Sequence, residues 1–140
     1  DTASTTSESY VSTGIEVSIT PSSTSSKILV IANPVIGGSS SGMSMVQLWR
    51  DSTVLIQADA SGDRGRSSSG WLYVYFMYQA LPIPIVYQDS PTSTSSLTYK
   101  VMHKTNSASY TTYVNRSEQW IDNSFYGVGA STITAMEIEG

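Results

Sequence analysis

Short apolar runs with alternating polar residues, separated by clusters of Ser, Thr, Gly and Pro, recur along this chain. In residues 14–19 (GIEVSI) every second side chain is apolar, which is the period of a β-strand with one buried face. No stretch longer than about ten residues has apolar side chains at the 3.6-residue spacing of a helix. The sequence therefore predicts an all-β protein made of short antiparallel strands joined by turns.

The turn residues divide the chain into about eight expected strands. Pro34 should end or bulge the apolar run 27–36, because proline cannot donate a hydrogen bond to a neighbouring strand. Residues 43–58 are expected to form a hairpin that turns at residues 50–52. The other strands are expected at 14–19, 71–80, 81–88 (a strand or sheet edge), 97–104, 109–116 and 131–140, with long loops at 59–70 and 117–130.

Length and composition fit a single domain. A chain of 140 residues can bury a core without metal ions or disulfides, and this one contains no cysteine. Residues 1–12 are polar and are expected to form an arm or linker. Residues 13–140 are expected to fold as one antiparallel β-sandwich, because many short strands with Gly, Pro and Ser turns are typical of sandwiches and jelly rolls.

The chain carries little charge. Its net charge is −4, and charged residues make up 13% of it, about half of the roughly 25% in an ordinary domain. Nucleic acid is not an expected partner, because phosphate binding needs clustered Lys and Arg. The longest apolar run, residues 70–85, is interrupted by Gln79 and two prolines and falls short of the ~20 residues of a membrane helix, so no membrane insertion is expected.

No motif for catalysis or for a cofactor stands out. His103 is the only histidine and lies in an expected strand, where a sheet histidine with satisfied hydrogen bonds is favoured over a catalytic one. Asp59 and Asp63 offer oxygen ligands for Ca²⁺, but their spacing fits no EF-hand loop, and Arg64 and Arg66 oppose a cation. We expect no metal, no cofactor and no enzyme activity.

Residues 70–85 (GWLYVYFMYQALPIPI) form the most apolar stretch. A strand over residues 71–80 would have two apolar faces, one with Trp71, Tyr73, Tyr75 and Met77 and the other with Leu72, Val74, Phe76 and Tyr78. An exposed apolar strip is an aggregation hazard. This stretch is therefore expected to be a central strand with one face in the core. The other face, favoured to be that of Tyr73 and Tyr75, is expected at an interface between copies of the chain.

A second aromatic cluster falls in the expected loop 117–130. Trp120, Phe125 and Tyr126 flank Asp122 and Asn123. Aromatic rings that stack on sugar faces, beside Asp and Asn that hydrogen-bond hydroxyl groups, are typical of a carbohydrate site. The alternative is structural, with Trp120 and Phe125 closing one end of the sandwich.

Five segments of the chain resemble a recurrent module of tail-fibre-like and structural proteins from marine bacteriophages, cyanophages included. They are SYVSTGIEVSITPSSTSSKILVIA, LWRDSTVL, DSPTSTSSLTYKV, YVNRS and STITAMEIEG, and the resemblance covers most of residues 9–140. It implies a jelly roll similar to those of C1q and tumour necrosis factor, assembled as a homotrimer at the end of a fibre. It also implies a place on the virion surface, with other virion proteins and a host-cell glycan as partners.

Loops 59–70 and 117–130 match this module least, as variable recognition loops would. Asp63, Arg64 and Arg66 therefore join the five residues of the second aromatic cluster as candidate ligand-binding residues. Three functions stay open: a fibre head that recognises a host glycan, a structural decoration protein that docks through residues 1–12, and a polysaccharide depolymerase.

Overall fold

The computed structural model of the protein describes residues 2–139, in which there are twelve β-strands and no helix. All strand pairings are antiparallel, which confirms the all-β prediction. The strands are β1 (Ser4–Thr5), β2 (Val11–Ile19), β3 (Lys27–Asn33), β4 (Val35–Gly38), β5 (Met43–Arg50), β6 (Thr53–Ile56), β7 (Trp71–Tyr73), β8 (Ala80–Pro82), β9 (Ile85–Asp89), β10 (Leu97–Thr105), β11 (Thr112–Val114) and β12 (Thr132–Ile138).

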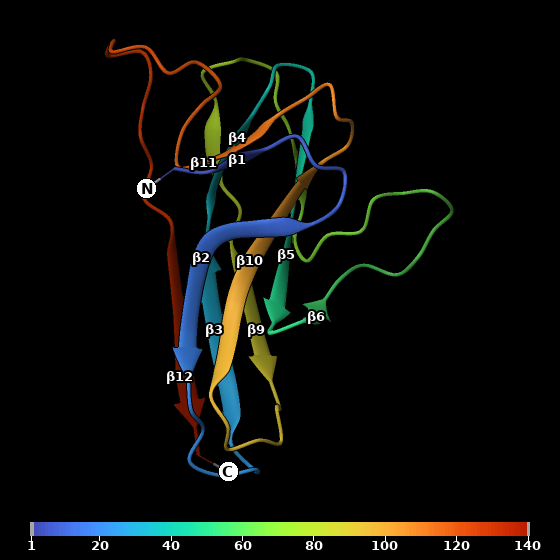
Figure 1. Ribbon diagram of the computed structural model, residues 1–140, viewed down its shortest axis with the longest axis vertical. Coiled ribbons are helices and arrows are strands. Elements are labelled where there is room, and N and C mark those ends of the chain that lie inside the picture. Colours follow the sequence, from blue (N-terminus) through green and yellow to red (C-terminus); the bar gives the residue numbers. More distant parts are fainter. Residues whose placement is uncertain (1, 140) are drawn as a thin grey trace.

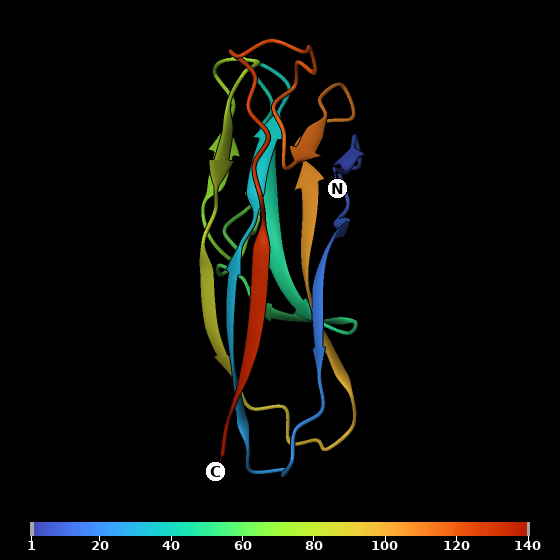
Figure 2. The ribbon, with the colours of Figure 1, turned by 90° about the vertical axis from the view of Figure 1, so that its left-hand side faces the viewer.

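The long strands form the two layers of an antiparallel β-sandwich (Figures 1 and 2). One layer is the sheet β2-β10-β5-β6, with β7 also paired to β5, and the other is the sheet β12-β3-β9. A third sheet, β1-β11-β4-β8, lies at the upper end of the molecule in Figure 1. It joins the second layer at Pro34, between β3 and β4, whose carbonyl accepts a hydrogen bond from Ile83 N at 2.9 Å.

The hydrophobic core lies between the layers. Alternate residues of the long strands are buried, because successive side chains of a strand point to opposite faces. In β3 these are Ile28, Val30 and Ala32, all without exposed surface. They pack with Ile36, Val46, Leu48, Ile83, Ile85, Leu97, Tyr99, Val101 and Val114.

Several elements that local sequence signals predict are confirmed. The expected hairpin forms from β5 and β6 and turns at Asp51, which has a positive φ of 52°. Pro34 separates β3 from β4, and Pro82 and Pro84 lie in or beside β8 and β9, which are the edge strands of their sheets. Of the expected strand 109–116, only the three residues of β11 form.

Residues 71–80 do not form the expected central strand, and that prediction is wrong. β7 ends after three residues, and residues 75–78 form an exposed turn before β8. Gln79 stabilises the turn, because its Oε1 accepts hydrogen bonds from the backbone N–H groups of Tyr75 (3.1 Å) and Phe76 (3.2 Å). A side-chain amide thus satisfies two donors that a central strand would pair with its neighbours.

Residues 2–10, which the sequence places in a polar arm or linker, lie along the sandwich. β1 pairs with β11, and the Ser7 carbonyl accepts a hydrogen bond from Thr105 N at 2.9 Å. β2 begins at Val11, before the expected residue 14. The partners of this segment lie about a hundred residues away in the chain, so no local pattern could indicate its pairing.

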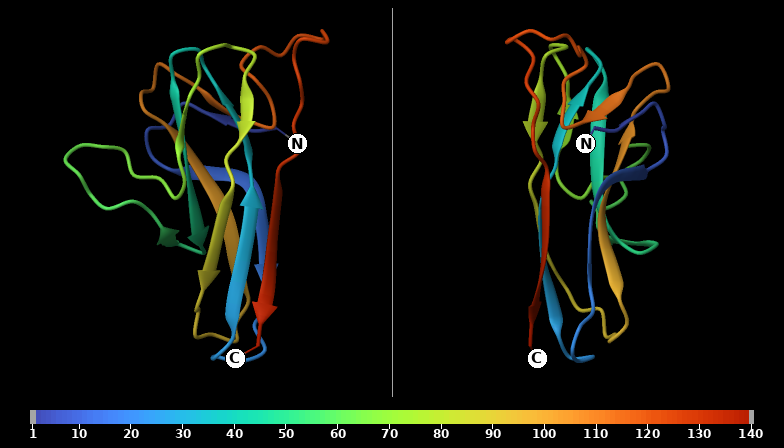
Figure 3. Two further views of the ribbon diagram at one scale, coloured as in Figure 1. Left: turned by 180° about the vertical axis from the view of Figure 1, so that it is seen from behind. Right: turned by 60° about the vertical axis from the view of Figure 1, so that its left-hand side comes forward.

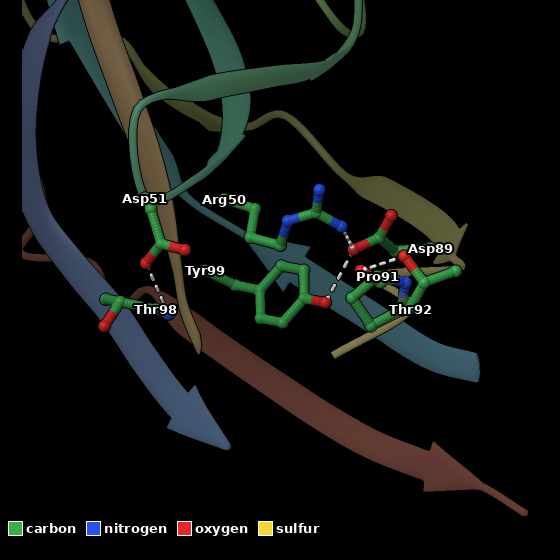
Figure 4. A network of polar contacts seen from close by, with 7 residues as sticks. All are labelled: Arg50, Asp51, Asp89, Pro91, Thr92, Thr98 and Tyr99. Atoms are coloured by element: carbon green, nitrogen blue, oxygen red, sulfur yellow. Dashed lines mark hydrogen bonds and ion pairs between the residues drawn. The ribbon is translucent and has the colours of Figure 1, made fainter. Parts of the chain in front are cut away.

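A buried polar contact joins the two layers (Figure 4). Asp89, at the end of β9, accepts hydrogen bonds at Oδ2 from Arg50 Nη1 of β5 (2.5 Å) and from Tyr99 Oη of β10 (2.7 Å). The Asp89 side chain is 8% exposed. Burial, together with the hydrogen bond to Asp89, raises the pKa of the Tyr99 phenol above its ordinary value, so the hydroxyl remains a donor. The contact fixes how one sheet lies on the other.

Replacing Asp89 by Ala should lower the free energy of unfolding by about 3 kcal/mol, because the Arg50 guanidinium and the Tyr99 hydroxyl lose their common acceptor. Tyr99→Phe removes one hydrogen bond and leaves the ion pair, so it should cost about 1 kcal/mol. Urea denaturation followed by tryptophan fluorescence measures both changes. A cost for Asp89→Ala no larger than that for Tyr99→Phe would contradict the role of this carboxylate.

His103 is fully buried in β10, but its Nδ1 has no hydrogen-bond partner within residues 2–139, so its hydrogen bonding is not satisfied as expected. Burial penalises the charged imidazolium and lowers the pKa of His103 to about 4, below the ~6.5 of an unfolded chain. Between these two values the unfolded chain binds a proton that the folded chain does not. The contribution of neutral His103 to stability is therefore complete above pH ~6.5 and is lost as the pH falls towards 4.

Lowering the pH from ~7 to ~4 should cost the wild-type protein up to about 3 kcal/mol of unfolding free energy through this group. The variant His103→Gln lacks that contribution, while the carboxyl groups titrate in both proteins. The difference between the wild-type and variant free energies, measured by urea denaturation across this pH range, isolates the histidine. Parallel pH profiles for the two proteins would show that another group is responsible.

Candidate functional site

Three loops meet at the upper end of the sandwich in Figure 1. They are residues 39–42 between β4 and β5, residues 74–79 between β7 and β8, and residues 117–130 between β11 and β12. We call their outer face the apical surface. It lies at the opposite end of the molecule from the last residues of β12 (Figure 2).

Hydrogen bonds tie each of these loops to the other two. Ser40 N donates to a Glu118 carboxylate oxygen at 2.9 Å, and Ser40 Oγ donates to the Tyr75 carbonyl at 3.3 Å. Gln119 N donates to the Met77 carbonyl at 3.2 Å. The apical surface is therefore a connected structure and not a set of independent loops.

The first residues of the loop 117–130 are held by close packing of β11 on β4. A Cβ atom at Gly37 would lie 2.3 Å from the Arg116 carbonyl oxygen and 3.2 Å from Ser117 Cα, so only glycine allows this approach. The Arg116 guanidinium lies over the rings of Tyr113 (4.1 Å) and Trp120 (5.3 Å), and its Nη1 donates to the Ser117 carbonyl at 3.1 Å. Stacking of a cation on an aromatic face is attractive, and here it positions the Trp120 ring.

A cavity of about 260 Å³ opens on the apical surface, lined by Trp120, Ile121, Asp122, Asn123, Tyr126 and Val128. Four of the five residues that the sequence predicts as a ligand site in this loop are thus brought together. Phe125 is the exception, because it does not line the cavity and its side chain is 84% exposed. Trp120 keeps 59% of its surface exposed, so its ring does not close the sandwich as a core residue would.

The polar groups of the cavity divide into those that build it and those that stay available. Tyr126 Oη donates to Gln119 Oε1 at 2.6 Å, and Asn123 Oδ1 accepts a hydrogen bond from Phe125 N at 3.0 Å. Within residues 2–139, the Asp122 carboxylate and the side-chain nitrogen of Asn123 have no hydrogen-bond partner. The cavity therefore presents an aromatic face, a strong acceptor and a free donor to a ligand.

The loop 74–79 adds a second group of exposed rings, which we call the aromatic turn: Tyr75, Phe76 and Tyr78. Their side chains are 69%, 46% and 52% exposed. The ring centroids of Tyr75 and Phe76 are 5.1 Å apart, and those of Phe76 and Tyr78 are 5.2 Å apart with nearly parallel planes. The sequence placed Phe76 and Tyr78 on the face opposite Tyr75, because the turn-forming role of Gln79 was missed.

The long loop before β7 projects from the side of the sandwich, away from the apical surface (Figures 1 and 3). Arg64 and Arg66 donate hydrogen bonds to oxygen atoms of residues 58–61, and Asp63 is exposed. The structure thus does not bring Asp63, Arg64 and Arg66 to the cavity of Trp120. Their expected part in ligand binding stays a prediction.

The residues expected at an interface between copies are also dispersed. Trp71 lines a separate cavity of about 300 Å³ with Arg64, Gly65 and two methionines. Tyr75 and Met77 lie in the turn at the apical end, whereas Trp71 and Tyr73 belong to β7. All four of Trp71, Tyr73, Tyr75 and Met77 are exposed in the single chain, and an interface through them stays a prediction.

Residues 2–139 contain no cluster of three or more His, Asp or Glu side chains arranged to hold a metal ion, and this includes the region of Asp59 and Asp63. The same residues include no helix with the length and hydropathy needed to cross a membrane.

Comparison with known proteins gives no family assignment: no protein-family model and no curated protein matches the chain.

Proposed function

We propose that this protein is a non-enzymatic recognition module that binds a glycan in the cavity of the apical surface. The observation that carries the proposal is the convergence of Trp120, Tyr126, Asp122 and Asn123 on one cavity. An aromatic face packs against the C–H groups of a sugar ring, and a carboxylate and an amide exchange hydrogen bonds with its hydroxyl groups. Binding sites commonly combine such an apolar lining with a few polar groups.

The shape of the site suits recognition on the outside of a larger particle. The three apical loops are grouped at one end of an elongated sandwich, opposite the end of β12 (Figure 2). The wider setting that we propose is the head of a bacteriophage tail fibre on the virion surface, with a jelly roll similar to those of C1q and tumour necrosis factor. This setting rests on the resemblance of the sequence segments.

The proposal includes assembly as a homotrimer, which also rests on the resemblance. Multi-angle light scattering at micromolar concentration should then give three times the 15.1 kDa mass of the chain. A monomer mass would remove the trimer from the proposal. It would leave glycan binding untouched, because the apical cavity is formed within one chain.

Trp120→Ala should abolish or weaken glycan binding by at least about tenfold, since it removes the largest ring of the cavity; tenfold corresponds to about 1.4 kcal/mol. Trp71→Ala is the matched control, because Trp71 is a tryptophan of similar exposure (54% against 59%) that lines another cavity. Binding is measured on an array of bacterial surface glycans and by a pull-down of host cells. Circular dichroism checks the fold of each variant, and light scattering checks that its mass equals that of the wild type, because Trp71 is also an expected interface residue.

Two results would count against glycan recognition. One is the absence of any signal on the array and in the pull-down for the folded wild-type protein. The other is equal loss of binding in Trp120→Ala and Trp71→Ala, which would place the ligand elsewhere. Asp122→Asn provides a second test of glycan binding. It should weaken binding, because a hydrogen bond from a sugar hydroxyl to a charged acceptor is worth about 1.5–3 kcal/mol.

A further inference from the structure

The cavity beside Trp120 is small for a glycan ligand. Its volume is about 260 Å³, below the roughly 300–1,000 Å³ of pockets that enclose a drug-sized molecule. It can hold about one sugar ring, and a single sugar ring makes few contacts with the protein. A ligand that binds with useful affinity therefore needs further surface outside the cavity.

The aromatic turn of Tyr75, Phe76 and Tyr78 is joined by a backbone hydrogen bond to the loop that forms this cavity, although none of its residues lines the cavity. Gln119 N and the Met77 carbonyl are hydrogen-bonded at 3.2 Å. Trp120 follows Gln119 and Tyr78 follows Met77, and consecutive Cα atoms are about 3.8 Å apart. Trp120, which lines the cavity, and Tyr78, which ends the aromatic turn, are therefore each one residue away from this hydrogen bond.

Most backbone groups of residues 75–77 are hydrogen-bonded within the apical surface, so the rings of the aromatic turn are its main free contact area. The N–H groups of Tyr75 and Phe76 donate to Gln79 Oε1, and Gln79 N donates to the Phe76 carbonyl at 3.0 Å. A peptide that added as a β-strand would need free backbone donors and acceptors here. The rings are also held in place before any ligand arrives, which reduces the entropy cost of binding.

Charge excludes one class of glycan. The loops 39–42, 74–79 and 117–130 contain two carboxylates, Glu118 and Asp122, and no Lys, Arg or His. Arg116, at the base of the longest loop, already stacks on Trp120 and bonds to backbone carbonyls. An acidic sugar would meet the unpaired Asp122 carboxylate with no cation to offset the repulsion.

We infer that the ligand is a neutral oligosaccharide of several units, with one sugar in the Trp120 cavity and the following sugars stacked along Tyr78, Phe76 and Tyr75. This inference rests on the proposed function and extends it. The cavity gives recognition of one ring, and the aromatic turn gives affinity that grows with chain length. Phe76 and Tyr78 stack on each other with nearly parallel planes, and Tyr75 meets Phe76 nearly edge-on at 73°, so the outer faces of these rings are the ones that can pack against sugars.

The test uses an array that carries neutral glucans, galactans and mannans as mono- to hexasaccharides, beside sialylated and uronic-acid glycans. The proteins are the wild type, Trp120→Ala, the double variant Phe76→Ala/Tyr78→Ala, and Val86→Ala. Val86 is an exposed apolar residue of β9, far from the apical surface (Figure 1), and is the control for loss of exposed apolar area. Light scattering and circular dichroism give the mass and fold of each.

The inference predicts that the wild type binds neutral glycans and binds hexasaccharides at least about tenfold more tightly than monosaccharides, equal to about 1.4 kcal/mol. The double variant should lose this length preference and keep weak binding of short glycans. Trp120→Ala should lose binding at every length, and Val86→Ala should behave as the wild type.

Three outcomes would overturn the inference while the proposed function stands. The first two are a length preference that survives in the double variant and a wild type that selects acidic glycans. The third is a wild-type oligomer that becomes a monomer in the double variant, since the rings would then be an interface between copies. No wild-type binding to any glycan would instead reject the proposed function, and the inference with it.

Discussion

Within residues 2–139, the Asp89 carboxylate joins the two layers through a buried ion pair and a hydrogen bond. Apolar packing between sheets is non-directional, so it favours burial without selecting one relative position. Asp89 supplies direction, because a single oxygen accepts from Arg50 of β5 and Tyr99 of β10. In a chain with 13% charged residues, few other side chains could do this. The chain continues from β3 of the second layer into β4, and β4 ends at the apical surface. The position of the second layer therefore also sets where β4 meets the apical loops.

Local chemistry explains which parts of the fold the sequence could predict. Pro34, the hairpin turn at Asp51 and the edge strands β8 and β9, with Pro82 in β8 and Pro84 just before β9, all depend on backbone rules that act within a few residues. β1 depends on a partner about a hundred residues away, which no local pattern indicates. The prediction of a central strand over residues 71–80 was wrong for another reason. Alternating apolar residues show that side chains are apolar, not whether a neighbouring strand is present to cover them.

In the candidate site, too, the features set by local sequence could be predicted and those set by distant contacts could not. Trp120, Asp122, Asn123 and Tyr126 lie within seven positions, so the sequence could group them and the structure places them around one cavity. Arg64 and Arg66 joined the expected site only because both loops were expected to vary, and the fold directs them to the side of the sandwich. The aromatic turn was missed because the role of Gln79 in forming it was missed, and its place beside the loop 117–130 could not be seen because Met77 and Gln119, which are hydrogen-bonded, are far apart in the sequence.

Exposed aromatic rings promote aggregation when they lie on an exposed strand edge, because a second chain can then pair with that edge. In the aromatic turn these two features are separated. Gln79 occupies the N–H groups of Tyr75 and Phe76, and the Met77 carbonyl is bonded to Gln119. A second chain would therefore meet exposed rings beside backbone groups that are mostly paired already. Gln79, which ends the expected strand, occupies two of the donors that strand addition would need and leaves the aromatic rings exposed at the apical surface.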